Sequence, residues 1–395
     1  MKIKEGFGYN DISVVPTVIS EISSRSECNP YYKENGMLPI FASCMSTVVD
    51  DKNYKDFEDN HITPVIPRNI DFLTRAHLSI DGKWVAMSLS EFEEFFMDNA
   101  GKRKPGTTYK VCVDIANGHM KKLYNICHDA KLLSIKYKYK LIIMTGNIAN
   151  PETYKWICDI NSDLYYDTGE LVVDYIRVGI GGGSMCITSS NVSIHYPMAS
   201  LIAGCNEYKT FTNNAPKIVA DGGIRNFSDV IKALALGADY VMVGGLFAGM
   251  YESASPLLYD ADFTYKGEYN EGYNEGPDDD IDSVFDGFYK GHCLFKDHAK
   301  TEEEKRENIK FYTLFKECYG MSTKQAQSLI GKTSRTSEGK TSMIPVKYTL
   351  FQWTDNMADY MKSAMSYCNC RNIEDFIGTP ETIINSPAEI AAVNK

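Results

Sequence analysis

The chain has 395 residues, of which 44% are hydrophobic and 24% are charged, and its formal net charge is −11. This balance is typical of a globular protein with a large core, and the acidic charge argues against a broad nucleic-acid-binding surface. No run approaches the roughly 18 apolar residues of a membrane span, and the first residues lack the apolar core of a secretory signal. We therefore expect a cytoplasmic protein without membrane or nucleic-acid partners, whose 11 cysteines are mostly free thiols.

Short, unbroken apolar runs recur through the first two-thirds of the chain and predict strands buried on both faces. They are residues 38–43, 62–66, 84–89, 109–116, 141–147, 175–180, 216–223 and 240–245. Segments with helical patterns separate them. The clearest, 226–239, has apolar residues at helical spacing, Asn226 or Ser228 as a candidate cap, and Gly237 as its end.

Eight strands that alternate with helices predict a (β/α)8 barrel, known as a TIM barrel. A doubly wound open sheet is the alternative, because periodicity does not report closure. In barrels the chemistry is carried by loops that follow the C-terminal ends of the strands. In this chain those loops hold Met45, Arg68, Asp114, Asn147, Gly179–Thr188, Asp221–Gly223 and Gly244–Gly245.

After the eighth strand the pattern changes to an acidic stretch, residues 257–305, which contains the small repeat EYNEGYNEG. We interpret it as a surface insertion that is partly disordered at 272–282. The whole chain, 1–395, is expected to form a single TIM-barrel catalytic domain that carries this insertion.

Glycine-rich loops follow strands six, seven and eight. Residues 179–183 contain four glycines, and Cys186 and Thr188 come directly afterwards. Such a loop can hold an ion through main-chain groups, although a tight turn beside a packed cysteine explains it equally well. The paired glycines at 222–223 and 244–245 follow strands seven and eight, where barrels commonly bind phosphate. Asp221 could accept hydrogen bonds from ribose hydroxyls or cap a turn.

Together these stretches resemble the IMP dehydrogenase/GMP reductase family over roughly residues 8–255 and 311–378, with the acidic insertion unmatched. GIGGGSMCIT is similar to the family's active-site loop, and VADGGI and VGGLFAGMYES look like its two phosphate loops. Further counterparts are SSRSE (23–27), VDIANGH (113–119), MTGN (144–147) and YGMS (319–322). No single glycine loop would be specific, but the combination is.

The resemblance implies a mechanism in which Cys186 attacks carbon 2 of a purine nucleotide and forms a covalent thioimidate. Thr188 and Glu338 would act as an acid–base pair in the proton transfers. In the reductase direction, NADPH reduces GMP to IMP and ammonia is released. An IMP dehydrogenase without its regulatory domain, and a purine-nucleotide-binding barrel without catalysis, are the alternatives.

The reductase direction is favoured by two absences relative to dehydrogenases. Only about twenty residues separate strands two and three, so there is no regulatory (CBS) domain there. Ser322 is followed by Glu338 after sixteen positions, without the Arg-Tyr pair of the dehydrogenase flap. SEGK (337–340) and GGLFAG (244–249) are also similar to the reductase versions.

The resemblance further implies three sets of binding residues. The nucleotide would be held by Ser184, Asp221, Gly222, Gly223, Gly244, Gly245, Gly320, Met321, Ser322, Arg335, Ser337 and Gly339. The nicotinamide cofactor would lie near Ser24, Arg25, Asp114, Ile115, Ala116, Ser334, Arg335, Ser363 and Tyr367. A potassium ion would bind carbonyl groups of Gly181, Gly183 and Cys186, and the chain would assemble as a homotetramer in which Ser363–Tyr367 reach a neighbouring subunit.

Four positions depart from the family pattern. Gly182 replaces the usual proline of the active-site loop, which makes the loop costlier to order. Ser189 stands where reductases commonly have arginine, and Ser46 where the family often has aspartate. Ile187 is closer to dehydrogenases than to reductases. These changes leave the cysteine in place and affect cofactor geometry, cation binding and the identity of the substrate.

Overall fold

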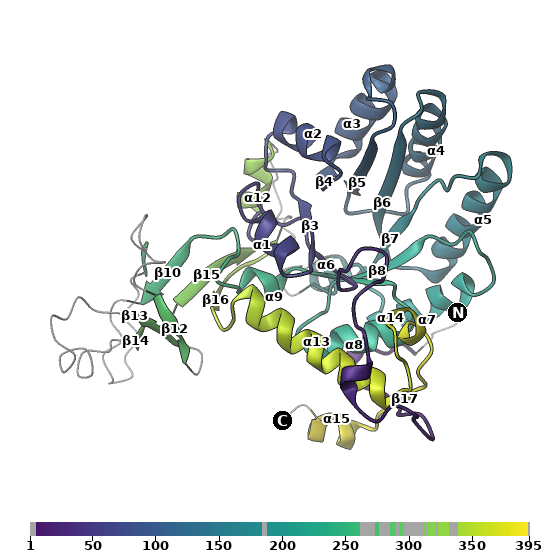
Figure 1. The fold of residues 1–395 in the computed structure, drawn as a ribbon. Helices are drawn as coiled ribbons and strands as arrows, with labels where there is room; N and C mark the ends of the chain where they lie inside the picture. Colours follow the sequence, from purple (N-terminus) through teal and green to yellow (C-terminus); the bar gives the residue numbers. More distant parts are fainter. Residues whose placement is uncertain are drawn as a thin grey trace.

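The computed structural model describes residues 5–183, 188–260, 273–275, 285–289, 292–295, 311–312, 314–320, 323–331 and 339–393. Within this part of the chain, eight parallel strands close into a barrel in chain order (Figure 1). They are β2 (Ile40–Ala42), β3 (Thr63–Ile66), β4 (Trp84–Met87), β5 (Thr108–Asp114), β6 (Lys140–Ile148), β7 (Tyr175–Val178), β8 (Lys217–Asp221) and β9 (Tyr240–Val243). The pairing of β2 with β9 closes the ring, which confirms the (β/α)8 barrel and excludes the open sheet.

Helices connect the strands and surround the barrel (Figure 1). They are α1 (Tyr54–Asp59), α2 (Phe72–Ile80), α3 (Leu89–Glu93), α4 (Lys121–Lys136), α5 (Pro151–Thr168), α6 (Thr188–Val192), α7 (Met198–Lys209), α8 (Phe227–Ala235) and α9 (Gly245–Ala248). The predicted end signals of α8 are confirmed. The Asn226 side chain accepts a hydrogen bond from the backbone N–H of Asp229 at 3.0 Å, and Gly237 has the positive φ that favours glycine.

Short elements extend the fold around the barrel. The turns η1 (Tyr9–Asp11), η2 (Arg25–Glu27), η3 (Glu94–Asp98) and η4 (Ala100–Lys102) precede or join barrel elements, and β1 (Ile12–Val14) pairs with β17 (Thr382–Ile384). The C-terminal helices are α12 (Lys324–Leu329), α13 (Leu350–Tyr367), α14 (Ile373–Phe376) and α15 (Pro387–Val393). Trp353 of α13 stacks on Phe227 of α8, with ring centroids 5.3 Å apart. In the part of the chain that the structure describes, no helix is long and apolar enough to cross a membrane.

The acidic insertion begins in a strand that pairs with another strand just beyond its end. Its first residues form β10 (Leu257–Asp260), which pairs antiparallel with β15 (Leu314–Tyr319), and β15 pairs in turn with β16 (Thr341–Pro345). Other strands of this region are β11 (Tyr273–Glu275), β12 (Phe285–Tyr289), β13 (His292–Phe295) and β14 (Phe311–Tyr312). They lie beside the barrel in Figure 1. Most of the stretch that we expect to be disordered lies outside the described residues.

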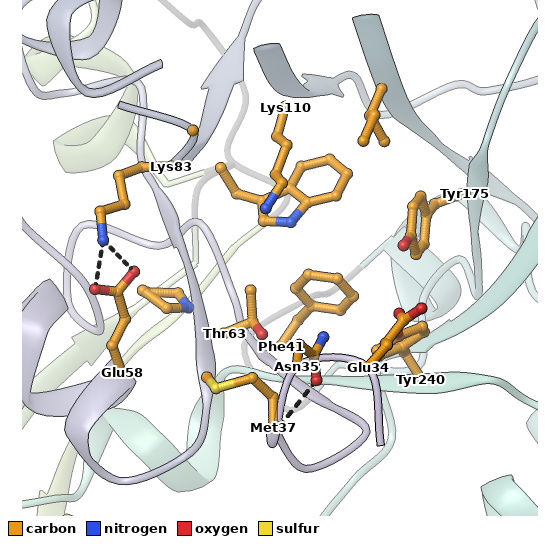
Figure 2. A pocket seen from close by; sticks show the side chains of 14 residues that line it. Glu34, Asn35, Met37, Phe41, Glu58, Thr63, Lys83, Lys110, Tyr175 and Tyr240 are labelled. Atoms are coloured by element: carbon orange, nitrogen blue, oxygen red, sulfur yellow. Dashed lines mark hydrogen bonds and ion pairs between the residues drawn. The ribbon is translucent and has the colours of Figure 1, made fainter. Parts of the chain in front are cut away.

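Alternate residues of the barrel strands point inward, and they form layers. At the N-terminal end of the barrel, aromatic rings from four strands meet, and Figure 2 labels Phe41, Tyr175 and Tyr240 among them. The Trp84 and Tyr175 ring centroids are 5.3 Å apart, and those of Phe41 and Tyr240 are 4.9 Å apart. One layer further along β7 lies Arg177, and the next inward positions are at the C-terminal rim. The barrel interior is therefore a filled core and not a pore.

Lys316 of β15 is buried, at 4% exposure, and its Nζ donates to the carbonyl oxygens of Ser253 at 3.0 Å and Ser255 at 2.6 Å. Burial lowers the pKa of this ammonium to about 8, below the roughly 10.4 of an exposed lysine. Between these two pH values the unfolded chain binds more protons, so we expect stability to rise with pH, by up to about 3 kcal/mol. Urea unfolding at pH 8, 9 and 10 measures this rise.

The matched comparison is between Lys316→Met and Lys340→Met, because Lys340 is an exposed lysine in the same sheet region. The Lys316→Met protein should lack the rise, and the Lys340→Met protein should keep it. An identical pH dependence in all three proteins would contradict the assigned burial penalty.

Candidate functional site

Five adjacent strands, β5 to β9, end in polar or glycine residues on the same rim of the barrel. The last or next residues are Asp114, Gly179, Asp221 and Gly244, and Asn147 is the penultimate residue of β6. Because the strands are parallel and neighbouring, their C-terminal ends bring these positions together, as the sequence predicted. This rim is the candidate active site.

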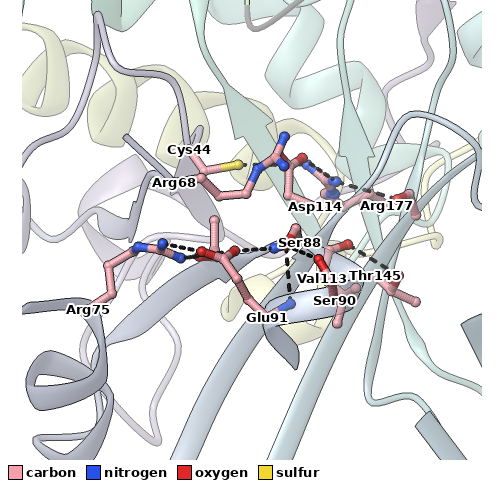
Figure 3. A network of polar contacts seen from close by, with 12 residues as sticks. Cys44, Arg68, Arg75, Ser88, Ser90, Glu91, Val113, Asp114, Thr145 and Arg177 are labelled. Atoms are coloured by element: carbon pink, nitrogen blue, oxygen red, sulfur yellow. Dashed lines mark hydrogen bonds and ion pairs between the residues drawn. The ribbon is translucent and has the colours of Figure 1, made fainter. Parts of the chain in front are cut away.

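Arg177 lies inside the barrel and contacts two carboxylates of the rim. It is 3% exposed and comes from β7, where it points inward between two apolar residues. Its guanidinium lies 2.9 Å from the Asp114 carboxylate and 3.6 Å from that of Asp221. Arg68, after β3, holds the other oxygen of Asp114 at 3.0 Å, as Figure 3 shows. Two arginines and two aspartates therefore form a charge-balanced network with little exposure.

The two aspartates respond differently to this network. Burial would raise the pKa of the Asp114 carboxyl, but the guanidiniums of Arg177 and Arg68 outweigh it and hold that pKa below its usual range. Burial prevails at Asp221 and raises its pKa, although Arg177 and a hydrogen bond from Asn147 oppose the shift. Asp114 is thus the fixed negative partner of the arginines, and Asp221 is the carboxylate whose charge is less well compensated.

The two carboxylate oxygens of Asp221 differ in their hydrogen bonds to the described residues. The Asn147 Nδ2 donates to Asp221 Oδ2 at 2.8 Å and also to the Gly179 carbonyl oxygen at 2.8 Å. Among the residues that the structure describes, Oδ1 of Asp221 accepts no hydrogen bond. The Asp221 side chain is 20% exposed, so this oxygen can accept a hydrogen bond from a ligand hydroxyl.

The loops after β7 and β8 pack so closely together that glycine is required at several positions. Gly222 has φ +102°, and a Cβ atom there would lie 3.1 Å from the backbone nitrogen of Gly183. Gly179 has φ +132°, and a Cβ atom there would collide with the backbone oxygen of Asp221. Met198, at the start of α7, packs against both loops. The two backbones therefore approach each other in a way that only glycine permits.

The loop after β9 approaches the loop after β2. A Cβ atom on Gly244 would lie 2.7 Å from Met45 Sδ and 3.4 Å from Ser43 Cβ. Gly245 begins α9, one residue later. Glycine-containing loops thus follow three neighbouring strands, β7, β8 and β9, and Asp221 is the last residue of the middle one.

Several predicted residues lie outside the described part of the chain: Ser184, Cys186, Met321, Ser322, Ser334, Arg335, Ser337 and Glu338. Thr188 is the first residue of α6, and its side chain is not described. Gly320 follows β15 and donates its N–H to the Lys340 carbonyl oxygen at 3.4 Å, so the predicted positions Gly320 and Gly339 lie on neighbouring chain segments.

The predicted cofactor residues fall into two groups. Asp114, Ile115 and Ala116 lie at the rim, after β5. Ser24 and Arg25 lie at η2, which packs on α13, where Ser363 and Tyr367 are found. Arg25 forms an ion pair with Asp359 of α13 at 3.3 Å, and Tyr367 is 68% exposed. No interaction among the described residues joins the two groups within one chain.

The carbonyl groups proposed for a cation are compatible with that role. Among the described residues, the carbonyl oxygens of Gly181 and Gly183 accept no hydrogen bond, whereas the neighbouring Ile180 carbonyl is bound to His195 Nδ1 at 2.9 Å. Gly181 has φ +74°, a conformation that turns successive carbonyls of the loop in different directions.

Sequence reasoning missed part of the rim. It named Arg68, Asn147 and Met45 as rim residues without giving them a role, and it did not single out Arg177 or Ser43. The available signal was the lone arginine in the apolar strand YIRV, because a charge at an inward position requires partners inside the barrel.

The closed barrel and its polar rim define a (β/α)8 protein whose binding region lies at the C-terminal ends of the strands. The sequence model described as IMP dehydrogenase / GMP reductase domain matches residues 107–275. The GMP reductases of Bacillus licheniformis and Bacillus subtilis (strain 168) are 28% and 27% identical to the chain over 282 and 269 residues. These alignments cover 67% and 66% of this chain, and 80% and 76% of the relatives.

The inosine-5'-monophosphate dehydrogenase of Chlorobaculum parvum is 28% identical over 267 residues, which cover 67% of this chain and 43% of that protein. The chain is thus similar to members of the IMP dehydrogenase/GMP reductase family, and the family's model matches its central part, residues 107–275. This is a family of oxidoreductases that act on purine nucleotides.

Proposed function

We propose that the protein is a GMP reductase, which converts GMP to IMP and ammonia with NADPH. The observation that supports this best is Asp221 at the end of β8, whose Oδ1 accepts no hydrogen bond from the described residues, between strands that are followed by glycine loops. It offers a ribose acceptor beside backbone groups that can bind a phosphate. The acidic insertion lies outside this rim.

The proposed reaction begins with the Cys186 thiolate, which forms a bond from sulfur to carbon 2 of the purine. The amino group on that carbon takes up a proton and leaves as ammonia, so a thioimidate links enzyme and nucleotide. A reduced nicotinamide, when bound, would supply the hydride that carbon 2 accepts. The carbon–sulfur bond then breaks, and IMP and the thiolate are released. Glu338 and Thr188 carry the proton to the departing amine.

Binding of the nucleotide is divided among the loops. Asp221 accepts a ribose hydroxyl, and the backbone amides of Gly222, Gly223, Gly244 and Gly245 bind the phosphate together with Ser184. The base lies toward Gly320 and Gly339, beside Met321, Ser322, Arg335 and Ser337. Arg177 takes no part in binding and instead holds Asp114 and Asp221 in place.

The nicotinamide cofactor would lie against Asp114, Ile115 and Ala116, where the backbone after β5 is accessible. Ser24, Arg25, Ser363 and Tyr367 form a separate exposed group, which supports a cofactor shared with a neighbouring subunit of a homotetramer, with Ser334 and Arg335 contributing from the loop before β16. Potassium would be held by the carbonyls of Gly181, Gly183 and Cys186.

The choice of reductase over dehydrogenase is supported by the extent of the alignments. They cover 80% of the B. licheniformis GMP reductase but only 43% of the C. parvum dehydrogenase. The dehydrogenase reaction, IMP to XMP with NAD, is the second candidate, because identity to the two kinds of relative is the same at 28%.

The deciding assay incubates the folded chain with GMP and NADPH, with and without potassium. We expect NADPH oxidation together with equal amounts of ammonia and IMP. The same preparation is given IMP and NAD, and XMP is measured. Turnover only in the second mixture would assign the dehydrogenase, and nucleotide binding without turnover in either would assign a non-catalytic barrel.

Glu338→Gln should slow ammonia release by about 10²- to 10⁴-fold, because a positioned proton donor or acceptor contributes roughly this factor. Dissociation constants for GMP should change less than threefold by the same reasoning, since the carboxylate acts on the departing amine. Rapid-quench measurement of ammonia and titration with GMP give the two quantities. An unchanged rate would remove Glu338 from the mechanism.

A further inference from the structure

The opposite end of the barrel, its N-terminal mouth, contains a cavity of about 450 Å³ (Figure 2). Its lining comes from the first residues of β3, β4, β5, β7 and β9, and from the loop before β2. This volume lies within the range of small-molecule sites, about 300–1,000 Å³. The cavity takes no part in the proposed reaction, which is confined to the C-terminal rim.

Four aromatic side chains line the cavity, and Tyr175 is the most accessible of them. Phe41, Trp84 and Tyr240 are almost fully buried behind the cavity, and Tyr175 is partly buried beside them. The Trp84 ring is edge-on to both Phe41 and Tyr175, with centroids 5.7 and 5.3 Å apart. These contacts fix the rings in place, so a planar ligand would meet a preformed surface at little cost in side-chain entropy.

Charged groups of opposite sign stand on the walls. Lys110 reaches in from β5, and Glu34 stands beside Tyr240 on the loop before β2 (Figure 2). Neither has a hydrogen-bond or ion-pair partner among the residues that the structure describes. Lys83 and Glu58 also line the cavity, but they are paired with each other at 2.7 Å. The free groups are therefore one ammonium and one carboxylate.

The cavity is separate from the catalytic rim. Lys110 and Asp114 both point inward from β5, four residues apart, which corresponds to roughly 13 Å along a strand. The layer between them is filled by Arg177 and by Cys112, which is fully buried. A molecule at the mouth therefore does not reach the nucleotide loops.

We propose that this cavity binds a small planar monoanion, an aromatic or heteroaromatic carboxylate that also carries a hydrogen-bond donor. The carboxylate pairs with the Lys110 ammonium, the ring lies on the aromatic walls, and the donor on the far side of the ring meets the Glu34 carboxylate. An inorganic anion would satisfy Lys110 alone and would leave the aromatic surface uncovered.

The probe is 4-aminobenzoate, which has a carboxylate and an amino donor at opposite ends of one ring; benzoate and inorganic phosphate are the comparison ligands. Binding is measured by calorimetry with the full chain and needs no turnover, so it is independent of the proposed reductase activity. We expect saturable binding of 4-aminobenzoate that excess GMP does not displace, weaker binding of benzoate, and none of phosphate.

Lys110→Met should weaken 4-aminobenzoate binding by about 10- to 100-fold, the worth of a charge-assisted hydrogen bond. Lys140→Met, which removes an exposed lysine at the start of β6, should leave it unchanged. Glu34→Gln, on an exposed loop where folding is not at risk, should abolish the preference over benzoate. Absence of saturable binding, displacement by GMP, or equal affinity in the Lys110 and Lys140 variants would overturn the proposal.

Discussion

Replacing Arg177 with methionine is expected to lower the free energy of unfolding by about 3–5 kcal/mol at pH 7.5, the usual loss when one partner of a buried ion pair is removed. The arginine is 3% exposed and lies between two carboxylates. Asp114 would keep Arg68, but Asp221 would keep only the neutral Asn147. Most of the lost stability should therefore come from the uncompensated negative charge of Asp221.

Because the lost stability comes from the charge of Asp221, it should depend on pH. The pKa of Asp221 is already raised by burial, and loss of Arg177 raises it further. The folded variant then binds a proton more readily than the unfolded chain, so its stability increases as the pH falls through the raised pKa toward the ordinary pKa of the unfolded chain. Urea unfolding at pH 7.5 and 5.5 should show a smaller deficit at the lower pH.

The double variant Arg177→Met, Asp221→Asn is the control, because it removes the uncompensated charge together with its partner. It should recover part of the stability lost in the single variant at pH 7.5. A single variant as stable as the parent protein, or a double variant with no recovery, would show that the network does not balance charge as described.

Replacing Cys186 with alanine is expected to abolish the covalent nucleotide adduct and to reduce turnover by a factor on the order of 10⁴ or more, as for other enzymes that lose their nucleophile. Binding of GMP should persist, because ribose and phosphate are held by other groups. Intact-protein mass spectrometry detects the adduct, and NADPH oxidation reports turnover.

The matched control is Cys205→Ala, which removes a fully buried thiol of α7 far along the chain from the active-site loop. That variant should keep both adduct and turnover, provided that it folds. An adduct retained at full level by the Cys186→Ala protein would assign the nucleophile to another residue.

The barrel was predictable from the sequence because every strand is a short apolar run that needs burial on both faces. The strand predicted at 109–116 corresponds to β5 (Thr108–Asp114), and the strand predicted at 240–245 corresponds to β9 (Tyr240–Val243). The predicted rim glycines and Asp221 also came together, since strand order alone places them on adjacent strands. Closure was predicted from the number and alternation of the elements, whereas the apolar pattern of the strands does not report it, because closure is a long-range property.

The charge network was beyond sequence reasoning for the same reason. Arg177, Asp114 and Arg68 lie on β7, after β5 and after β3, and their pairing depends on the register of the closed barrel. Lys110 likewise resembles an ordinary strand residue until its neighbours across the barrel are known. The catalytic roles of Cys186, Thr188 and Glu338 rest on the family resemblance and stay predictions.

The antiparallel pairing of β10 with β15 gives the acidic segment an attachment in which its two ends are held side by side. Tyr259 lies opposite Leu314, so the two ends of the intervening chain are one strand spacing apart, about 5 Å. Changes in the length of that intervening chain need not displace either end, and each doubling of a flexible loop costs only about 0.6 kcal/mol. The fold can thus accept a module of almost any size at this point, exchanged or lost as a unit, while the nucleotide loops keep their geometry.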